Sequence, residues 1–362
     1  MKIYFTVTTD LSYDQRMIRI CTSLTTAGHE VVLVGRKRKN SVNLVLQPFT
    51  QKRLYCFFDK GKLFYAEYNF RLFFYLLFKN MNCICAIDLD TILPCYFISR
   101  IKNVHRVYDA HELFCEMKEI VTRPSIYKIW KKIEQFTVPK FKHGYTVNQP
   151  IAYEFKKMYG VNYSVIRNVP VLTLTSPVNN HEKFILYQGA VNEGRCFETL
   201  IPAMKDVNSK LVICGDGNFM QQAKSLVAKY QLEEKIIFKG AVTPEELKLI
   251  TREAYAGINL VENNGLSNYL SLANKFFDYI HAGIPQLCVN YPAYSEINSQ
   301  FRVAVLTNDT SVENLALNLN NLLTDGVLYE ELKSNCDKAK EYYNWQQEQK
   351  ELIDFYSKIE NE

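Results

Sequence analysis

The chain has 362 residues, of which 48% are hydrophobic and 22% are charged, and it contains no low-complexity tract. This composition excludes a disordered or fibrous protein, and the length favours two domains of roughly 150–200 residues each. Residues 1–170 hold 26 Lys and Arg against 13 Asp and Glu, whereas the remainder holds 17 against 25. The basic half could face nucleic acid or an anionic membrane, but its basic residues are not interleaved with a nucleic-acid-binding motif, so no nucleic acid partner is expected.

Ten cysteines are scattered along the chain, and only Cys83 and Cys85 lie close together. A C-x-C pair alone is not a metal-binding spacing, so we expect ten reduced and mostly buried thiols. The N-terminus starts directly with a strand-like run, without a secretory signal, and no stretch of about 18 uncharged apolar residues follows. The expected location is therefore the cytoplasm.

The first half alternates strands and helices. A helix is predicted over residues 14–27, ended by Gly28. Strands or strand-containing runs are predicted at residues 3–7, 29–36, 83–91, 106–114, 143–148 and 163–168. Strands that are apolar on both faces, joined by helices, indicate a parallel sheet covered on both sides.

A Pro-, Thr- and Asn-rich stretch over residues 169–183 separates this series from a second one. The second series has strand-like runs at residues 183–191, 209–217, 235–242, 254–261, 284–290 and 302–307. We predict an α/β protein with two Rossmann-like, doubly wound domains facing a central cleft. The predicted boundaries are an N-terminal domain over 1–170, a linker over 171–182, a C-terminal domain over 183–340, and a final helix over 341–362 that crosses back to the first domain.

Two turns of the second domain suggest an anion site. In "QGAVNEGRCFETLI", Arg195 is predicted to open a helix just after a strand and a glycine-containing turn. Its guanidinium would add donors to free backbone amides and suit an anion, although a solvated surface arginine is equally compatible with this motif. "ICGDGN" is a strand and a Gly-Asp-Gly turn that lacks the dinucleotide-binding spacing, so alone it indicates only a tight turn.

The stretch "LSLANKFFDYIHAGIPQL" places Lys275 and Asp278 on one face of a helix that stops at Gly283. Lys275, near the helix start, could hold a phosphate, and Asp278 could accept hydrogen bonds from a ribose diol. Upstream, Gly265 would let the backbone approach a ligand closely. A surface ion pair is the commoner meaning of this spacing, but the surrounding apolar residues favour a nucleoside diphosphate site.

These segments together resemble glycosyltransferase family 4, a retaining family with the GT-B fold. "NGLSNYLSLANKFFDYIHAGIPQ" is similar to its nucleotide-sugar signature, "LYQGAVNEGRCFETLI" to its phosphate-binding segment, and "LVICGDG" to its next strand and turn. "DLSYDQRMIRICTSLTTAGHEVVLVGR", "AIDLDTILP" and "VYDAHELF" resemble its N-terminal motifs. The resemblance covers nearly the whole chain, and it indicates the family more strongly than the substrate.

The resemblance implies roles for particular residues. The residues implied in catalysis are His111, Arg195 and Lys275. Those implied in donor binding are Gly189, Arg195, Gly215, Glu262, Gly265, Leu266, Lys275 and Asp278. Two positions depart from the family: Asp278 stands where glutamate is usual, and Leu270 replaces an acid, so Glu262 is expected to take over in holding the donor sugar.

The acceptor is expected on the first domain. The acceptor-side residues are Asp10, Tyr13, Arg16, Asp90 and Glu112. For His111, the alternative is a structural histidine that caps the next helix, and Asp14 is equally compatible with a helix N-cap. Asp88 and Asp90 form a D-x-D pair, which is a weak motif, so we predict no metal site and no cofactor beyond the donor substrate.

Residues 54–78 are rich in aromatics but interrupted by charges. Such a segment could lie in a membrane interface, which makes an anionic membrane surface a possible partner and peripheral attachment to the inner face of the cytoplasmic membrane an expectation. The alternative is two helices that pack on the sheet.

The predicted function is retaining, metal-independent transfer of a sugar from a nucleoside-diphosphate sugar to a hydroxyl of a glycan or lipid-linked acceptor, in bacterial surface polysaccharide assembly. Two alternatives stay open. A nucleotide-sugar epimerase would use the same donor site, and a non-catalytic binding partner would be compatible with Asp278 and Leu270.

Overall fold

The computed structural model describes residues 1–173 and 183–362 and divides into two compact units. Unit 1 comprises Met1–Asn168 together with Gln346–Glu362, and unit 2 comprises Val169–Trp345. Most of the predicted linker lies outside the described residues. None of the helices in the described ranges has the length and apolarity needed to cross a membrane.

Unit 1 contains a parallel sheet in the order β3-β2-β1-β4-β5-β6-β7. Its strands are β1 (Lys2–Thr6), β2 (Glu30–Lys37), β3 (Thr50–Tyr55), β4 (Cys83–Ile87), β5 (His105–Ala110), β6 (His143–Thr146) and β7 (Ser164–Val165). The chain runs outward from β1 to β3 and then returns to the other side of β1, so the strand order reverses between β1 and β4. In open α/β sheets, ligands bind beyond the carboxyl ends of the strands at such a reversal.

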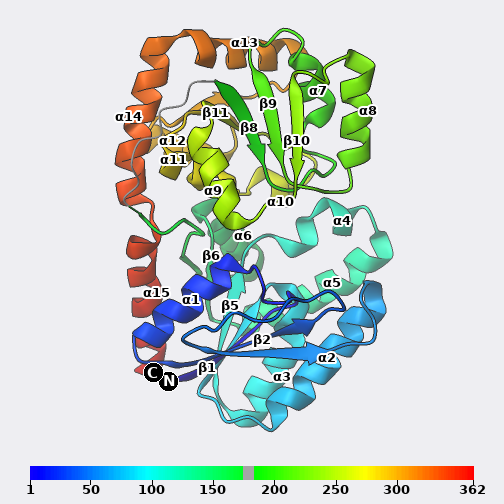
Figure 1. The fold of residues 1–362 in the computed structure, drawn as a ribbon. Helices are drawn as coiled ribbons and strands as arrows, with labels where there is room; N and C mark the ends of the chain where they lie inside the picture. The colour runs from blue at the N-terminus through cyan, green and yellow to red at the C-terminus, as the bar shows by residue number, and fades with distance from the viewer. Residues whose placement is uncertain (174–182) are drawn as a thin grey trace. The chain divides into compact units, whose positions relative to one another are not determined.

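Helices join these strands. They are α1 (Gln15–Thr26), α2 (Gly61–Leu77), α3 (Ile92–Lys102), α4 (Lys118–Val121), α5 (Pro124–Thr137), α6 (Gln149–Tyr159) and α15 (Trp345–Glu360), with short 3-10 turns η1 (Leu89–Thr91), η2 (Phe114–Glu116) and η3 (Val138–Lys140). The end of α15 lies beside the chain start, where the Met1 amine is 2.8 Å from Glu360 (Figure 1). Along α15, Glu348 accepts a 2.7 Å hydrogen bond from the backbone N–H of Arg167.

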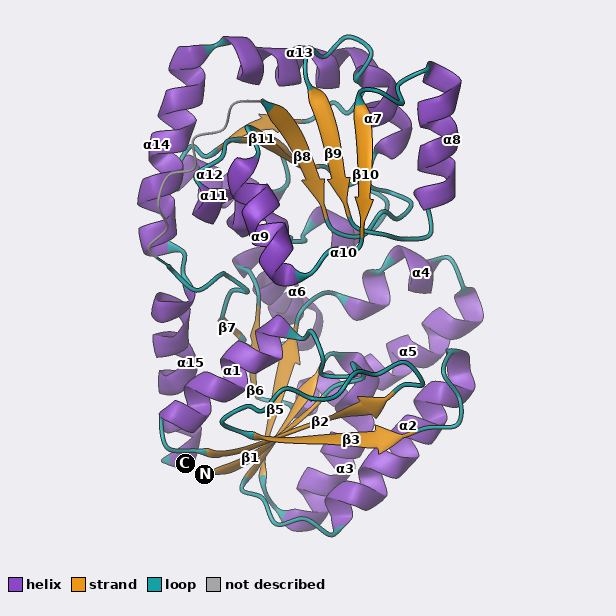
Figure 2. Ribbon diagram, in the orientation of Figure 1, coloured by secondary structure: helices purple, strands orange, loops and turns teal. Residues whose placement is uncertain are grey.

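Unit 2 repeats the pattern with the order β10-β9-β8-β11-β12-β13. Its strands are β8 (Phe184–Gln188), β9 (Lys210–Cys214), β10 (Ile236–Gly240), β11 (Ala256–Asn259), β12 (Gln286–Val289) and β13 (Ala304–Thr307). Its helices are α7 (Phe197–Ala203), α8 (Met220–Tyr230), α9 (Pro244–Glu253), α10 (Leu266–Tyr269), α11 (Asn274–Ala282), α12 (Pro292–Gln300), α13 (Val312–Thr324) and α14 (Gly326–Tyr342). Figure 2 shows β8, β9 and β10 as arrows that end at one edge, and the order reverses between β8 and β11.

The two parallel-sheet, Rossmann-like domains predicted from the alternating pattern are confirmed. Strands β4, β11 and β12 are buried at every position, as expected for strands covered on both faces. Strand β3 was not predicted, because its residues lie at the sheet edge, alternate in exposure and include polar side chains. Two helices were the alternative for residues 54–78, whereas the structure has the end of β3 and the single helix α2.

Candidate functional site

The residues predicted to bind the donor lie in unit 2, near the point at which the strand order reverses. Gly189 follows β8 and Gly215 follows β9, with φ angles of +115° and +146°. A Cβ added to Gly215 would lie 1.8 Å from the carbonyl oxygen of Gly189. Only glycine therefore allows these two turns to touch, and their contact shapes the edge at which a ligand would sit.

Lys275 lies in the first turn of α11, and its Nζ atom is buried without a hydrogen-bond partner among the described residues. The ammonium stands over the ring of Tyr187, 3.9 Å from its centroid. Burial, reinforced by the positive charge of Arg195, lowers the pKa of Lys275 to about 7. An unpaired buried cation is costly, so this position favours an anion that supplies the missing charge.

Arg195 contributes the second cation, and its side chain has no hydrogen bond or ion pair in the parts of the chain that the structure describes. It lies between Gly194 and Cys196, so α7 begins two residues after the position at which the sequence analysis started the helix. The backbone N–H of Glu262 donates to the carbonyl of Gly194 at 2.9 Å, which ties the loop after β11 to the Arg195 turn. The predicted donor residues Arg195 and Glu262 are therefore held on adjoining loops.

Asp278 is one turn further along α11, and it does not pair with Lys275. Its Oδ2 accepts a 2.8 Å hydrogen bond from Nε2 of Gln188, and the Oε1 of Gln188 accepts one from Thr251. The surface ion pair considered above is therefore not formed. Gln188 is the last residue of β8 and is buried, so this chain fixes the Asp278 carboxylate at the end of the strand.

The loop before α11 carries the remaining predicted donor residues. Gly265 is the N-cap of the four-residue helix α10, and Leu266 is its first residue. Leu270 is buried, so an apolar side chain fills the position at which the resembled family has an acid. The Glu262 carboxylate accepts a hydrogen bond from Asn264 at 3.2 Å, which places an acid on the neighbouring loop.

The second group lies at the strand-order reversal of unit 1. His111 follows β5, and its backbone N–H donates to Oδ1 of Asp88, which follows β4. The Nδ1 atom of its ring is 3.4 Å from Oδ2 of Asp88, and its Nε2 atom is 3.2 Å from Oδ2 of Asp109. The imidazole is therefore fixed on both sides by carboxylates, while about a quarter of the side chain stays exposed.

Arg16, from α1, completes this network. Its Nη2 pairs with Oδ1 of Asp109 at 2.9 Å, its Nη1 donates to the carbonyl of Ile166, and its Nε lies 2.9 Å from Nε2 of His111. The side chain is only 5% exposed, so it lies behind His111. Arg16 is thus held inside this network, and its predicted contact with the acceptor stays a prediction.

The protonation state of His111 determines which hydrogen bonds form in this network. When the ring is neutral at Nε2, that nitrogen accepts from Arg16, and Oδ2 of Asp109 is left buried without a partner. When Nε2 is protonated, it can donate to that oxygen, but it no longer accepts the hydrogen bond from Nε of Arg16. Burial alone would lower the pKa of His111, but Asp109 and Asp88 outweigh burial and raise it to about 9, so the imidazolium is the main form at neutral pH.

The other acids of unit 1 have unequal surroundings. Asp90 accepts from the hydroxyl of Thr8 at 2.6 Å, and burial together with the charge of Asp88 raises the pKa of Asp90 to about 6. Burial and the same charge raise the pKa of Glu112 to about 7. Carboxyl groups with raised pKa values beside a charged histidine are typical of sites that move protons or bind polar substrates.

Three further predictions concern the loop after β1. Asp10 accepts from the backbone N–H of Ser12 and from the hydroxyl of Ser41, so it holds its own loop together. Tyr13 is 68% exposed. Asp14 caps α1 through a 3.2 Å bond from the backbone N–H of Met17, which is the alternative that the sequence analysis held open for it.

Asp109 and Gln188 were not predicted as site residues. Both lie within predicted strands, at positions where apolar residues are expected. A charged or amide side chain in a strand covered on both faces requires a buried partner, and this was the available signal.

Comparison with known proteins shows similarity to glycosyltransferases. Residues 175–341 match the sequence model of the family described as Glycosyl transferases group 1. An uncharacterized glycosyltransferase of Methanocaldococcus jannaschii is 25% identical over 186 residues, which cover 49% of this chain and 46% of that protein. The matched region thus spans about half the length of this curated relative.

Solved structures share the whole fold. A sucrose-phosphate synthase from Thermosynechococcus elongatus has a TM-score of 0.82 at 15% identity, with 99% of each chain covered. Anabaena HepE in complex with UDP and glucose has a TM-score of 0.76 at 12% identity, also with 99% of each chain covered. The chain therefore has the GT-B fold, and residues 175–341 are similar to the family described as Glycosyl transferases group 1.

Proposed function

We propose that this protein is a glycosyltransferase that uses a nucleoside-diphosphate sugar as donor. The observation that carries this proposal is the buried, unpaired ammonium of Lys275 beside Arg195. A diphosphate supplies the negative charge that both cations lack, and it presents several oxygens to the guanidinium and ammonium groups. The complex of Anabaena HepE with UDP and glucose supports this class of ligand.

The chemistry proposed is transfer with retention at the anomeric carbon, on the front face of the sugar. The bond from that carbon to the donor phosphate breaks, the bond to the acceptor oxygen forms, and the leaving phosphate takes the acceptor proton. Arg195 and Lys275 would stabilise the charge that develops on the diphosphate, and His111 would hold polar groups of the sugar or phosphate. No metal has a role in this scheme.

A thermal-shift panel of UDP, GDP, ADP, CMP and dTDP tests the donor site. We expect one nucleoside diphosphate to raise the Tm of the wild type, and Lys275→Met to lose most of that shift. Lys248→Met is the matched control, because Lys248 is an exposed lysine of the same unit. A shift of equal size in Lys275→Met and the wild type would contradict the assigned phosphate role.

The corresponding nucleotide sugar then separates the activities. Release of nucleoside diphosphate that requires an acceptor, with an unchanged anomeric configuration in the product, supports retaining transfer. Epimerisation of the nucleotide sugar without an acceptor would support an epimerase. Binding without either reaction would favour a non-catalytic partner, for which the buried Leu270 and the bond from Gln188 to Asp278 are the specific observations.

The acceptor proposed is a hydroxyl of a glycan or lipid-linked molecule, in bacterial surface polysaccharide assembly at the inner face of the cytoplasmic membrane. Helix α2 supports membrane contact, because it carries two apolar stripes. Its buried stripe is Phe64, Tyr68, Leu72 and Leu76. A second stripe is formed by Phe70 and Phe74 of α2 and by its C-cap residue Phe78, which are 65%, 44% and 80% exposed.

Exposed aromatics next to basic residues favour an anionic lipid surface. We expect sedimentation with phosphatidylglycerol vesicles at low salt and its loss in Phe70→Glu/Phe74→Glu. Phe97→Glu is the control on another helix, since that side chain is also exposed. Equal sedimentation of the two variants, or none of the wild type, would count against a peripheral membrane role.

A further inference from the structure

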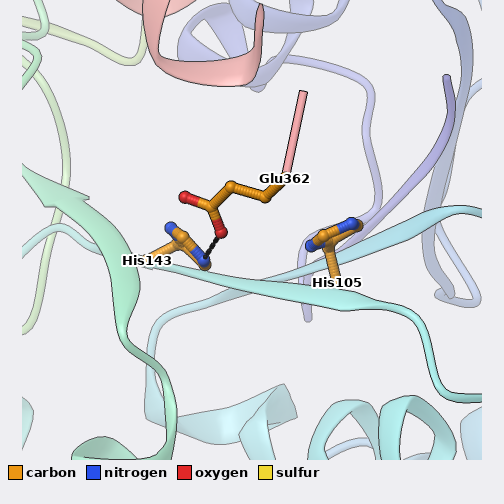
Figure 3. Close-up of side chains that lie close together, drawn as sticks. All are labelled: His105, His143 and Glu362. Carbon is orange, nitrogen blue, oxygen red and sulfur yellow. Dashed lines mark ion pairs between the residues drawn. The ribbon is translucent and has the colours of Figure 1, made fainter. Parts of the chain in front are cut away.

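Three side chains with metal-binding atoms meet at the amino-terminal edge of the unit 1 sheet. His105 begins β5, His143 begins the neighbouring strand β6, and Glu362 follows α15. Their ligand atoms all lie within 4.8 Å of one another. Figure 3 shows the Glu362 carboxylate reaching the His143 ring, with which it forms a 3.1 Å ion pair, while the His105 ring lies on its other side.

The sheet register brings the two histidines to the same face. His143 is the register partner of Val107 in β5, and His105 precedes Val107 by two residues. Side chains two residues apart in a strand point to the same face. The two ring centroids are accordingly 6.5 Å apart.

We propose that His105, His143 and Glu362 bind one Zn²⁺ ion, with water completing the coordination. Two imidazoles and a carboxylate form a ligand set that zinc accepts, at bond lengths of about 2.0–2.2 Å. Tetrahedral ligand atoms are then about 3.3 Å apart. The pair formed by His143 and Glu362, 3.1 Å apart, is already close to this spacing. Because all three ligand atoms lie within 4.8 Å of one another, His105 needs to move inward by at most about 1.5 Å.

The surroundings allow this movement. In the described ranges, the His105 ring forms no hydrogen bond, and the His143 ring bonds only with Glu362. Because neither ring has a second carboxylate or carbonyl partner to fix it, we expect micromolar affinity rather than the tighter binding of sites with such support. The bound metal would link the end of α15 to the starts of β5 and β6.

The zinc site is separate from the proposed donor and acceptor chemistry. His105 begins β5 and His111 lies just beyond its other end, so roughly 20 Å separates them at the rise of a β-strand. Loss of zinc should therefore leave glycosyl transfer unchanged. Failure of one proposal can thus be told from failure of the other.

Calorimetric titration of the metal-stripped full chain with Zn²⁺ at pH 7.5, where free histidine is mostly neutral, tests the site. We expect one equivalent to bind to the wild type and at least tenfold weaker binding in His105→Gln, His143→Gln and Glu362→Gln. Glu360→Gln is the matched control, because Glu360 lies at the end of the same helix but pairs with the Met1 amine. Equal Tm values without metal would show that the variants are folded.

Binding to the double variant His105→Gln/His143→Gln that is as tight as binding to the wild type would overturn the proposal. A parallel titration with Co²⁺ identifies the competing ligands. Thiolate charge-transfer absorption of unchanged strength in the double variant would assign the metal to one of the ten buried cysteines, and it would equally overturn the histidine site.

Discussion

The candidate sites of unit 1 and unit 2 differ in how their charges are balanced. In unit 1, Arg16, Asp109, Asp88 and His111 form a network whose charges compensate one another inside the protein. In unit 2, Arg195 and Lys275 are two cations that lie close enough for the first to lower the pKa of the second, and neither pairs with an acid among the described residues. The cations of the first site are thus paired with acids, whereas those of the second are not paired within the described ranges.

This difference shows how each site would work. A compensated network can hold an imidazole in one orientation before substrate arrives, which is what positioning requires. An uncompensated pair stores electrostatic energy that a diphosphate releases on binding. Removing a charge should therefore destabilise unit 1 and stabilise unit 2.

The largest effect is expected for Asp109→Asn. This change leaves the buried Arg16 without its carboxylate, and breaking such a pair costs about 3–5 kcal/mol of unfolding free energy. It should also lower the pKa of His111 below about 9, which NMR titration of the ring would follow. Asp90→Asn is the control, because Asp90 accepts only from Thr8 through its described side-chain bonds. If urea denaturation shows that Asp109→Asn lowers the free energy of unfolding no more than Asp90→Asn does, the compensated network is contradicted.

In contrast to Asp109→Asn, Lys275→Met is expected to stabilise the protein in the absence of ligand. Removing a buried unpaired cation should raise the unfolding free energy by roughly 1–3 kcal/mol at pH 6–7. The lowered pKa means that the unfolded chain holds the lysine proton more tightly, so the advantage should shrink as pH rises from about 7 toward about 10.4. Lys248→Met should change little at any pH. Destabilisation by Lys275→Met would show that the ammonium is already compensated.

A smaller effect is expected for His111→Gln. Because the pKa of His111 is raised to about 9 in the folded state, its contribution is fully present below about 6.5 and is lost as pH rises through about 9. The variant should be about 1–2 kcal/mol less stable than the wild type near pH 6, and the difference should decline between about pH 6.5 and pH 9 and be absent above that range. A difference that does not vary with pH would mean that the ring acts through packing alone.

The smallest effect is expected from chelation. We propose that cationic side chains, and no metal ion, stabilise the charge of the diphosphate. EDTA should therefore change the transfer rate by less than about twofold, although it should remove zinc from the site formed by His105, His143 and Glu362. Steady-state rates with and without EDTA provide the measurement. Loss of activity that Mg²⁺ or Mn²⁺ restores would replace part of the role given to Arg195 and Lys275.

The fold was largely predictable because both sheets are parallel and buried, which leaves apolar runs separated by amphipathic helices. The strand β3 was missed because an edge strand needs no continuous apolar run. For the site, motif positions identified Lys275, Asp278 and His111 as residues of interest. Periodicity also placed Lys275 and Asp278 on one helical face, and both contact residues of β8.

What could not be predicted is which charges compensate one another. The pairing of Arg16 with Asp109 joins residues 93 positions apart, and that of Asp278 with Gln188 joins residues 90 apart. Only the strand order brings these residues together. The shift in the pKa of Lys275 depends likewise on burial and on Arg195, neither of which local sequence fixes.

Proton uptake on donor binding tests the central claim most directly. Calorimetry at pH 8 in buffers of different ionisation enthalpy would use the nucleoside diphosphate that stabilises the protein most. With a pKa of about 7, Lys275 is mostly neutral at pH 8 in the free protein, and the bound diphosphate should raise that pKa. We predict uptake approaching about 0.9 proton per molecule bound at pH 8, little uptake at pH 5.5, and none in Lys275→Met. Tight binding at pH 8 without proton uptake would contradict the uncompensated cation as the basis of the site.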